Sequence, residues 1–305
     1  MDSMIQALPF NPASLHGLSE RLVRSHFDNN YSGAVKRLNA IRSRLDGLPF
    51  ATTPGFELNG LKREELVAAN SMLLHELHFA SMGGDGGNMA PAMALALSAS
   101  FGSVERWREE FVAMGQALGG GSGGWVLLVF QPRDGSLVNQ WALDHTHALA
   151  GGVPVLALDM YEHAYHLDFG AHAGAWVDAF MHNLDWEAVY ERYQRAVHGT
   201  SEAFGVEHGE VSGADLLDVR RAGVFEAASQ MLPAAQWRDP ARVGEWGPAL
   251  DREREVVVYC VYGHEVGRTT AMRLRAQGLQ ARFLRGGFDG WQSAGLPVVN
   301  KGEGA

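Results

Sequence analysis

The sequence predicts an α+β N-terminal half, built from a helical hairpin and a small antiparallel sheet with helices, followed by a small α/β module with a parallel sheet. In the first half, apolar residues recur at helical spacing over residues 19–45 and 64–81, before any strand. Three short apolar runs then follow, at 125–130, 138–143 and 153–158, as in a small sheet. Beyond residue 213, strands alternate with helical segments, a pattern typical of a parallel sheet.

The helical segments of the first half are separated by strong breakers. A loop rich in proline and glycine is expected over residues 47–60, between the two helices of the hairpin. The second helix ends at the glycine-rich stretch 82–87. Residues 104–118 form an amphipathic helix that carries Trp107, Phe111 and Met114 on one side. The first half of the chain therefore begins with helices whose apolar faces must pack against other elements of the chain.

The sheet of the first half is marked by turn signals. A glycine-rich run at 119–124 leads into the first strand, and Asp134-Gly135 is a hairpin turn signal before the second. The third strand ends at Asp159, and helical patterns resume to about residue 197. An antiparallel sheet followed by helices completes the α+β half.

The chain of 305 residues is long enough for two domains. We expect a first domain over residues 1–198, a polar linker over 199–213 and a second domain over 214–305. In the second domain, strands are expected at 216–220, 255–259 and 281–284, with a helix at 266–277.

Composition and charge exclude several classes of function. The formal net charge of −10 divides into −8 for residues 1–199 and −2 for the rest, so neither half has the basic excess that attracts nucleic acid. No stretch approaches the ~20 apolar residues of a membrane helix, and the N-terminus does not resemble a signal peptide. We therefore expect a soluble cytoplasmic protein without nucleic-acid or membrane partners. The lone cysteine, Cys260, excludes an internal disulfide.

Histidines in apolar surroundings predict a metal site. His26 and His75 each lie on an apolar helix face, where metal coordination is one way to satisfy a buried imidazole. Asp159 follows a buried strand, and His163 comes four residues later. Three nitrogens and one oxygen suit Fe, Mn or Zn, whereas calcium and magnesium prefer more oxygens.

The segment from Asp159 to Tyr165, with the sequence DMYEHAY, resembles the signature of the iron/manganese superoxide dismutases. The order of helical hairpin, sheet and helices agrees with that family over residues 6–198. The resemblance implies one Fe or Mn ion per chain, held by His26, His75, Asp159 and His163, with a water or hydroxide as fifth ligand. It also implies that the metal alternates between +3 and +2 while superoxide is converted to dioxygen and hydrogen peroxide.

The same resemblance implies a homodimer through the metal half. Glu162 matches the glutamate that reaches the partner subunit's ligand histidine, and Asn183 and Trp186 match the closing helix.

Several positions depart from the family pattern. Ala34 stands where the gateway tyrosine is usual, and Tyr31 offers a nearby phenol as the candidate for proton supply. Asn30 replaces a histidine, and Tyr161 stands where tryptophan is common. His145 resembles a replacement for the glutamine that bonds the metal-bound solvent, and it is the candidate to tune the metal. These departures affect proton delivery and metal preference more than metal binding.

Cys260 lies between the buried strand 255–259 and the following helix. A helix N-terminus stabilises a thiolate, so we expect a reactive cysteine. Residues 210–299 resemble a single-domain rhodanese in LLDVR at 216–220, PAAQW at 233–237, the Cys260 loop and GGFDGW at 286–291. The resemblance implies that Cys260 carries sulfur as a persulfide from an unidentified donor to an unidentified acceptor.

Charged residues around Cys260 leave the sulfur donor open. Glu265 would repel an anionic donor such as thiosulfate, and Arg268 lies further along than the usual loop arginine. His264 is either a thiolate partner or a surface residue. Asp218 and Arg220 are expected to form a structural pair.

Two readings of the whole chain remain. One is a superoxide dismutase with a sulfurtransferase-like module. The other is a sulfurtransferase or sulfur carrier whose metal half is a dimerising or sensing scaffold with little turnover. A zinc hydrolase has less support, because catalytic zinc usually keeps an open position and a nearby carboxylate base.

Overall fold

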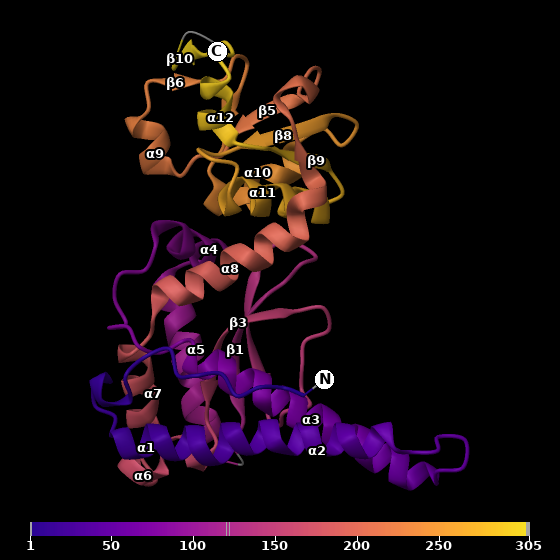
Figure 1. Ribbon diagram of the computed structural model, residues 1–305. Coiled ribbons are helices and arrows are strands. Elements are labelled where there is room, and N and C mark those ends of the chain that lie inside the picture. Colours follow the sequence, from indigo (N-terminus) through magenta and orange to yellow (C-terminus); the bar gives the residue numbers. More distant parts are fainter. Residues whose placement is uncertain (1, 120, 122, 303–305) are drawn as a thin grey trace.

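The computed structural model describes residues 2–119, 121 and 123–302. It shows a helical and antiparallel half below a smaller half with a parallel sheet, joined through the long helix α8 (Figure 1). This confirms the predicted fold class. Within the glycine-rich run 119–124, residues 120 and 122 lie outside the described residues, as do 303–305 of the expected second domain.

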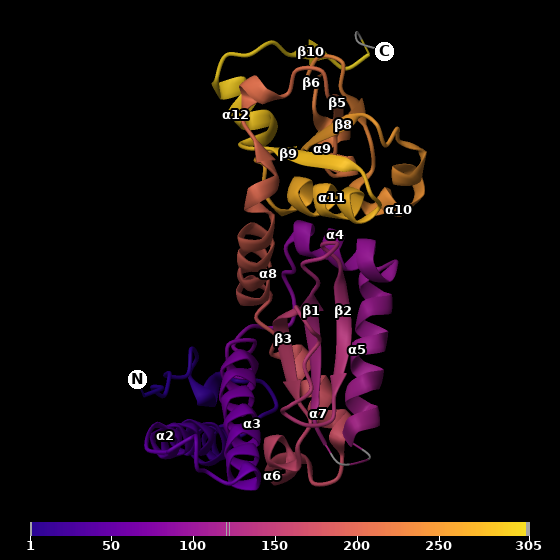
Figure 2. The same ribbon diagram turned by 90° about the vertical axis from the view of Figure 1, so that its right-hand side faces the viewer.

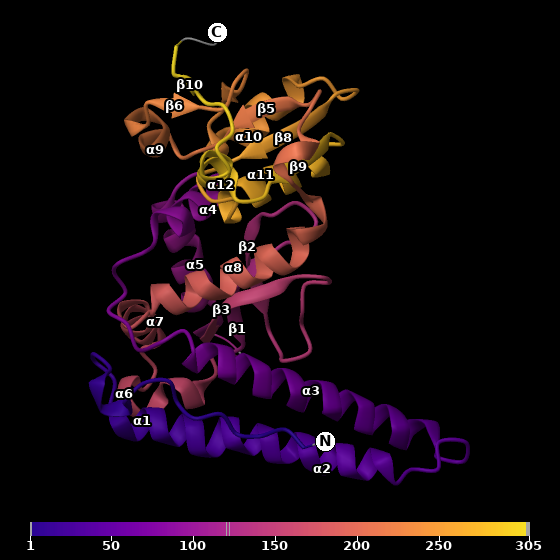
Figure 3. The same cartoon turned by 45° about the horizontal axis from the view of Figure 1, so that its top comes forward.

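The first half begins with a helical hairpin that extends away from the sheet (Figure 3). Its first arm passes from an α-helix through a π-helical turn into a second α-helix, and its other arm is one long helix. The elements are η1 (Pro12–Ser14), α1 (Glu20–Ser25), η2 (His26–Tyr31), α2 (Ser32–Asp46) and α3 (Gly55–Phe79). The expected loop 47–60 is thus shorter, because α3 starts directly after Pro54, whose fixed φ suits a helix start.

The remaining helices of the first half surround a three-stranded antiparallel sheet of order β2-β1-β3. The strands are β1 (Trp125–Phe130), β2 (Leu137–Ala142) and β3 (Val153–Asp159), close to the predicted ranges. The helices are α4 (Pro91–Phe101), α5 (Val104–Gly119), η3 (Glu162–Ala164), α6 (His166–Phe169), α7 (Ala173–His182) and α8 (Trp186–Ser201). The sequence prediction missed α4, whose apolar residues show no helical periodicity.

The register of the sheet positions the end of β3. Trp125, the first residue of β1, pairs with Asp159, the last residue of β3. Every residue of β1 is buried, because helices cover one face and α3 and the 143–152 loop lie against the other. Asp159, which is fully buried, therefore lies between the sheet and the helices.

The second half is a five-stranded parallel sheet of order β4-β9-β8-β5-β7 with a separate pair β10-β6. Its strands are β4 (Gly205–Val206), β5 (Asp215–Asp218), β6 (Gln230–Met231), β7 (Gln236–Trp237), β8 (Glu255–Tyr259), β9 (Gln280–Leu284) and β10 (Val299–Asn300). Its helices are η4 (Glu202–Phe204), η5 (His208–Glu210), α9 (Ala222–Ala227), η6 (Pro240–Arg242), α10 (Val243–Trp246), η7 (Gly247–Ala249), α11 (Glu265–Ala276) and α12 (Gly287–Ser293).

The segment expected as a linker, 199–213, is structured. It holds the last turn of α8 and the strand β4, which pairs with β9 in the parallel sheet. Val206 is fully buried there, so an apolar side chain in an otherwise polar segment fixes this strand to the second core.

The two halves pack directly on each other, with α4 and the ends of the first sheet facing α10 and α11 (Figure 2). Met272 of α11 is 1% exposed and belongs to the core of the first half. The guanidinium of Arg273 donates to Ser100 Oγ at 3.1 Å, which adds a polar contact beside this apolar one. None of the helices within the described ranges has the length and apolar character needed to cross a bilayer.

Candidate metal centre and thiol site

Four side chains from four segments converge in the first half. His26 begins the π-helical turn η2, His75 lies in α3, Asp159 ends β3 and His163 lies in η3. One potential ligand atom from each lies within 4.8 Å of all the others. A single π-helical turn inside an α-helix is rare and is frequent at functional sites. The four residues that the sequence predicted as ligands are thus brought together.

The three imidazoles point the same ring nitrogen at one carboxylate oxygen. The Nε2 atoms of His26, His75 and His163 lie 3.1, 3.4 and 3.3 Å from Asp159 Oδ2. His26, His75 and Asp159 are at most 2% exposed, whereas 31% of the His163 side chain is exposed. Three members of the cluster are therefore buried, and His163 is the one whose side chain is partly exposed.

The hydrogen bonds of His75 fit metal coordination. Its Nδ1 lies 2.6 Å from the carbonyl oxygen of Ser71, which can only accept, so the ring proton is on Nδ1. The lone pair of Nε2 is then directed into the cluster, where it is buried and has no hydrogen-bond partner within the described residues. A buried polar atom without a partner is costly. An ion bound among three imidazole nitrogens and one carboxylate oxygen would satisfy it.

Burial and charge set the protonation states of the cluster. Burial lowers the pKa of His26 below its ordinary value, and it lowers the pKa of His75 to about 3. Burial alone would raise the pKa of Asp159, but His163 and His26 together hold it well below its usual range. Neutral imidazoles and an ionised carboxylate are the forms that bind metals.

Asp159 is held in place by groups that do not belong to the cluster. Its Oδ1 accepts a hydrogen bond from the backbone N–H of Tyr161 at 2.9 Å, and its carbonyl oxygen accepts one from Trp176 Nε1 at 2.8 Å. These bonds leave Oδ2 free to face the histidines. Such supporting contacts orient metal ligands and tune their basicity.

His145 lies beside the cluster with a defined tautomer. The indole N–H of Trp125 donates to His145 Nδ1 at 2.9 Å, so the ring proton of the neutral imidazole is on Nε2. The rings of His145 and His75 have centroids 6.3 Å apart. Tyr161 packs between His145 and His163, at ring-centroid distances of 5.1 and 5.5 Å, and burial raises its pKa to about 12.

Tyr31 lies away from the four-residue cluster. Its phenol donates to Glu76 Oε1 at 2.9 Å and accepts from the backbone N–H of Gln6 at 2.7 Å. Its ring contacts Phe79, which in turn packs on His26 with ring centroids 5.0 Å apart. A catalytic role for Tyr31 stays a prediction, and the phenol oxygen is already engaged in two hydrogen bonds.

His78 is a residue that sequence reasoning passed over. It is fully buried, 5.3 Å from the His26 ring centroid, and its Nδ1 lies 3.1 Å from the carbonyl oxygen of Ala157. Its Nε2 has no partner within the described ranges, and its ring stacks on Phe180. The signal was present, because His75 and His78 are three residues apart and therefore share a helix face.

The remaining family-like residues have structural surroundings. The side chain of Asn183 accepts from His16 N–H and donates to His16 carbonyl, both at 2.7 Å, which ties the N-terminal segment to α7. The indole of Trp186 donates to the carbonyl of Gly86 at 3.2 Å. Glu162 is exposed next to His163 and makes no ion pair within the described residues.

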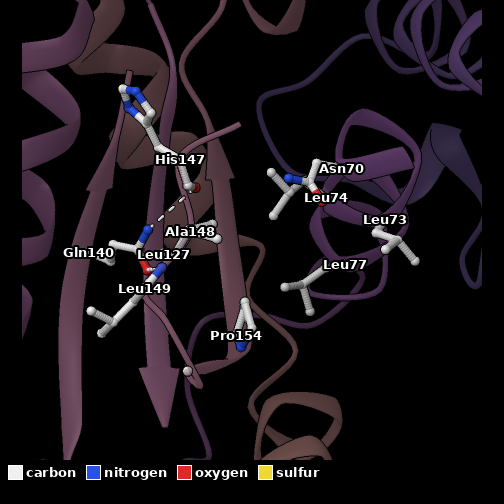
Figure 4. A pocket seen from close by; sticks show the side chains of 11 residues that line it. Asn70, Leu73, Leu74, Leu77, Leu127, Gln140, His147, Ala148, Leu149 and Pro154 are labelled. Atoms are coloured by element: carbon white, nitrogen blue, oxygen red, sulfur yellow. Dashed lines mark hydrogen bonds between the residues drawn. The ribbon is translucent and has the colours of Figure 1, made fainter. Parts of the chain in front are cut away.

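A separate apolar cavity of about 340 Å³ lies between α3 and the 143–152 loop (Figure 4). Leucines from both sides line it, and the Gln140 amide donates to the carbonyl oxygen of His147 at its edge. The Asn70 side chain also reaches across to the carbonyl of His145 at 2.5 Å. The cavity contains none of the four clustered residues, so we assign it no chemistry.

In the second half, Cys260 lies between β8 and α11 as predicted. It is 5% exposed, and the backbone N–H groups of Gly267, His264, Tyr262 and Gly263 act on its sulfur. Burial nevertheless raises the pKa of the Cys260 thiol, and these backbone groups offset only part of the rise. The backbone groups thus favour the thiolate as expected, but desolvation outweighs them, and the reactivity of Cys260 stays a prediction.

The charged residues near Cys260 are arranged as two networks. Arg220 is buried and binds the carboxylate of Asp218, which also accepts from the Tyr259 phenol at 2.9 Å, so the expected structural pair is present. Arg268 donates to the carbonyl of Gly263 at 2.9 Å and to Glu202 at 2.8 Å, away from the sulfur. His264 is exposed at the start of α11.

Known proteins resemble both halves. Residues 89–192 match the C-terminal domain of the iron/manganese superoxide dismutases, and residues 206–294 match the rhodanese-like domain. The superoxide dismutase [Fe] of Cupriavidus metallidurans is 62% identical over 193 residues, which cover 63% of this chain and 97% of that protein. The superoxide dismutase [Mn] 1 of Haloferax volcanii is 33% identical over 199 residues, 64% of this chain and 97% of that protein.

These likenesses agree with the four-residue cluster of the first half and with the parallel sheet of the second. The first two-thirds of this chain therefore belong to the iron/manganese superoxide dismutase family, and a rhodanese-like domain follows them.

Proposed function

We propose that the first half dismutes superoxide with one Fe or Mn ion held by His26, His75, Asp159 and His163. The observation that carries this proposal is the convergence of three Nε2 atoms within 3.1–3.4 Å of Asp159 Oδ2, with His75 Nε2 otherwise unpartnered. The relatives named for Fe and for Mn support the choice of these two metals.

When bound, such an ion supplies the one-electron chemistry, alternating between +3 and +2 as one superoxide is oxidised and the next is reduced. The chain holds the ion, excludes bulk water and positions protons. Asp159 contributes the negative charge that offsets part of the metal's charge. His145, with its proton on Nε2, offers a hydrogen-bond donor beside the cluster.

Metal reconstitution tests the proposal. The protein is stripped, reloaded with Fe or with Mn, and assayed for superoxide loss. We expect about one ion per chain and activity that is lost in His163→Ala. His166→Ala is the matched control, because His166 is an exposed histidine three residues away that lies outside the cluster. Bound metal without superoxide loss would leave the first half as a scaffold, which is the alternative reading.

We also propose that the protein is a homodimer through the metal half. Glu162 is exposed and makes no ion pair with any described residue, and it lies beside His163, the one cluster residue with a partly exposed side chain. Leu167 is 48% exposed in the same segment, so an apolar side chain accompanies the carboxylate. A second copy covering this segment would pair the carboxylate and close the open side of the site.

For the second half we propose sulfur transfer through Cys260. The rhodanese-like match and the four backbone N–H groups around the sulfur support it. Mass spectrometry after exposure to thiosulfate is expected to show one added sulfur on the chain, absent in Cys260→Ser. In this division of labour, residues 1–198 hold the metal, 214–305 carry the thiol chemistry, and 199–213 join them.

A further inference from the structure

The apolar cavity of about 340 Å³ lies between α3 and the loop 143–152, which joins β2 to β3 (Figure 4). Among the residues that line it, Leu74 and Leu127 are the most deeply buried, at 8% and 2% exposure. Leu77 of α3 and Leu149 of the β2–β3 loop lie on opposite sides of it. None of the described lining residues is a lysine, an arginine, an aspartate or a glutamate. The cavity is therefore an apolar space with walls on two sides.

Hydrogen bonds hold the β2–β3 loop in place over the cavity. The Gln140 side chain donates to the carbonyl oxygen of His147 at 3.4 Å and accepts from the backbone N–H of Leu149 at 3.0 Å. From the other side, the Asn70 amide of α3 donates to the carbonyl oxygen of His145 at 2.5 Å. The loop is thus tied both to β2 and to α3.

A glycine lets the β2–β3 loop approach the sheet. A Cβ atom on Gly152 would lie 2.5 Å from Val129 Cγ1 and 3.2 Å from the carbonyl oxygen of Leu149. A larger residue there would push the loop outwards, because packed side chains leave no space for it. The backbone N–H of Gly152 donates to the same Leu149 carbonyl at 2.9 Å, which closes a turn. The cavity is therefore preformed in the folded chain.

Few polar groups are left for a ligand in the cavity. The imidazole of His147 is exposed and turned away from the leucines (Figure 4), and its Nδ1 accepts from the backbone N–H of Leu143 at 3.2 Å. The Nδ2 atom of Asn70 is engaged by the loop, whereas its Oδ1 accepts no hydrogen bond from any residue that the structure describes. The lining thus suits an uncharged, apolar body and offers it at most one or two hydrogen bonds.

We propose that this cavity binds one small, uncharged and largely apolar organic molecule, about the size of a bicyclic aromatic compound. At packing densities of about 0.55–0.74, a cavity of 340 Å³ encloses roughly 190–250 Å³ of ligand atoms. Pockets for small molecules begin at about 300 Å³ and are mostly apolar with a few polar groups. A leucine-lined cavity of about 150 Å³ already binds benzene. The site is separate from the four-residue cluster, and its occupancy does not depend on superoxide dismutation.

The bound molecule contacts the elements that place His145. Leu74 directly precedes His75 in α3. Leu127 lies in β1, the strand that begins with Trp125, whose indole donates to His145 Nδ1 at 2.9 Å. His145 itself belongs to the β2–β3 loop. A ligand packed between the loop, α3 and β1 adds contacts that are lost when the loop opens, so it makes opening of the loop rarer.

A dye titration tests the binding site. N-Phenylnaphthylamine, an uncharged dye that fluoresces in apolar surroundings, is added to the metal-loaded full chain. We expect a saturable rise in fluorescence, with about one dye per chain and a Kd of about 1–50 µM. Leu77→Trp fills the cavity from α3 and is expected to weaken binding at least about ten-fold. Ala148→Phe fills it from the exposed loop and keeps the test decisive if Leu77→Trp disturbs α3.

The matched control is Leu66→Trp, because Leu66 is 47% exposed on the same helix but does not line the cavity. This variant is expected to bind the dye as the wild type does. Displacement of the dye by naphthol and by naphthoate, which share one ring system, tests the charge preference. Naphthol is expected to displace the dye at a concentration at least about ten-fold lower, because a buried carboxylate would find no cation in the lining.

Hydrogen exchange at saturating dye tests the restraint on the loop. Backbone amides of the β2–β3 loop are expected to exchange about three- to ten-fold more slowly, and those of α12 at an unchanged rate. Dye binding without this slowing would overturn the restraint. Equal affinities of the wild type and both filled variants, or equal displacement by naphthol and naphthoate, would overturn the binding site. Dye binding that weakens as the protein concentration rises would overturn it too, because a second copy of the chain would then cover the cavity.

Discussion

The indole N–H of Trp125 donates to Nδ1 of His145 across 2.9 Å. Trp125 also pairs in register with Asp159, so one residue at the start of β1 positions both a cluster carboxylate and the neighbouring imidazole. Because Nδ1 accepts, the neutral His145 ring carries its proton on Nε2 and can donate a hydrogen bond there.

Replacing this donor should weaken activity without removing the metal. In Trp125→Phe, the His145 tautomer is no longer fixed. We expect the rate of superoxide removal to fall by about ten-fold at unchanged metal content. Trp107→Phe is the control, because Trp107 is equally buried but its indole bonds to Asn139 away from the cluster. Equal losses in the two variants would indicate a packing effect instead of a tautomer effect.

Removing the metal should destabilise the first half. The ion binds a preformed site that the unfolded chain lacks, so its binding free energy adds to the free energy of unfolding. At a free metal concentration about 100 times the Kd, we expect the chelated protein to lose about 2.7 kcal/mol of unfolding free energy. Urea unfolding of stripped and reloaded protein measures this loss. Identical curves would contradict metal binding at the cluster.

Tyr31 should matter for stability at alkaline pH more than for turnover. Burial raises its pKa to about 12; the backbone N–H of Gln6 opposes the rise and Glu76 adds to it. A raised pKa means that the stabilisation is fully present below the unfolded value of about 10 and is lost as pH rises from 10 towards 12.

The Tyr31→Phe variant isolates this effect. Between pH 9 and 11, its free energy of unfolding is expected to depend less on pH than that of the wild type. This window covers about half of the interval between the unfolded pKa of Tyr31, about 10, and the folded pKa, about 12. The rate of superoxide removal at pH 8 is expected to change less than about three-fold. A fall in this rate of more than about one hundred-fold would support the predicted role of Tyr31 in proton supply.

The two halves should unfold together. Met272 belongs to the second half but is buried in the core of the first half. The substitution Met272→Ala is therefore expected to lower the free energy of unfolding by about 2–4 kcal/mol. Tryptophan fluorescence and Cys260 accessibility should shift together along the urea axis. Leu232→Ala, in the second half's own core, is the control for effects confined to that half. Separate transitions for the two probes in the wild type would show that the interface is weak.

Removing the exposed carboxylate beside the metal site should weaken the dimer. In Glu162→Ala, we expect light scattering to report a larger fraction of monomer at micromolar concentration, because a buried charge pair at an interface is lost. Glu187→Ala, a first-turn carboxylate of α8, is the control. A wild type that is monomeric under the same conditions would contradict the proposed interface.

The sequence by itself determined the strands and candidate ligands that can be recognised from neighbouring residues alone. A motif with a fixed spacing, such as Asp159 and His163 after a buried strand, indicates both a site and its ligands. The strands β1, β2 and β3 could be predicted because short apolar runs and turn signals are local. The Cys260 loop was placed for the same reason, between the apolar run 256–259 and a helix.

Only the tertiary structure decided what depends on contacts between distant segments. Helix α4 has apolar residues on all sides because it is covered by both halves, and so it shows no periodicity. Burial raises the pKa of the Cys260 thiol, and how deeply a thiol is buried is decided by the packing of the folded chain and not by the local strand-to-helix pattern. A cavity lined by both Tyr190 and Cys260 exists only because two halves predicted as separate units pack together.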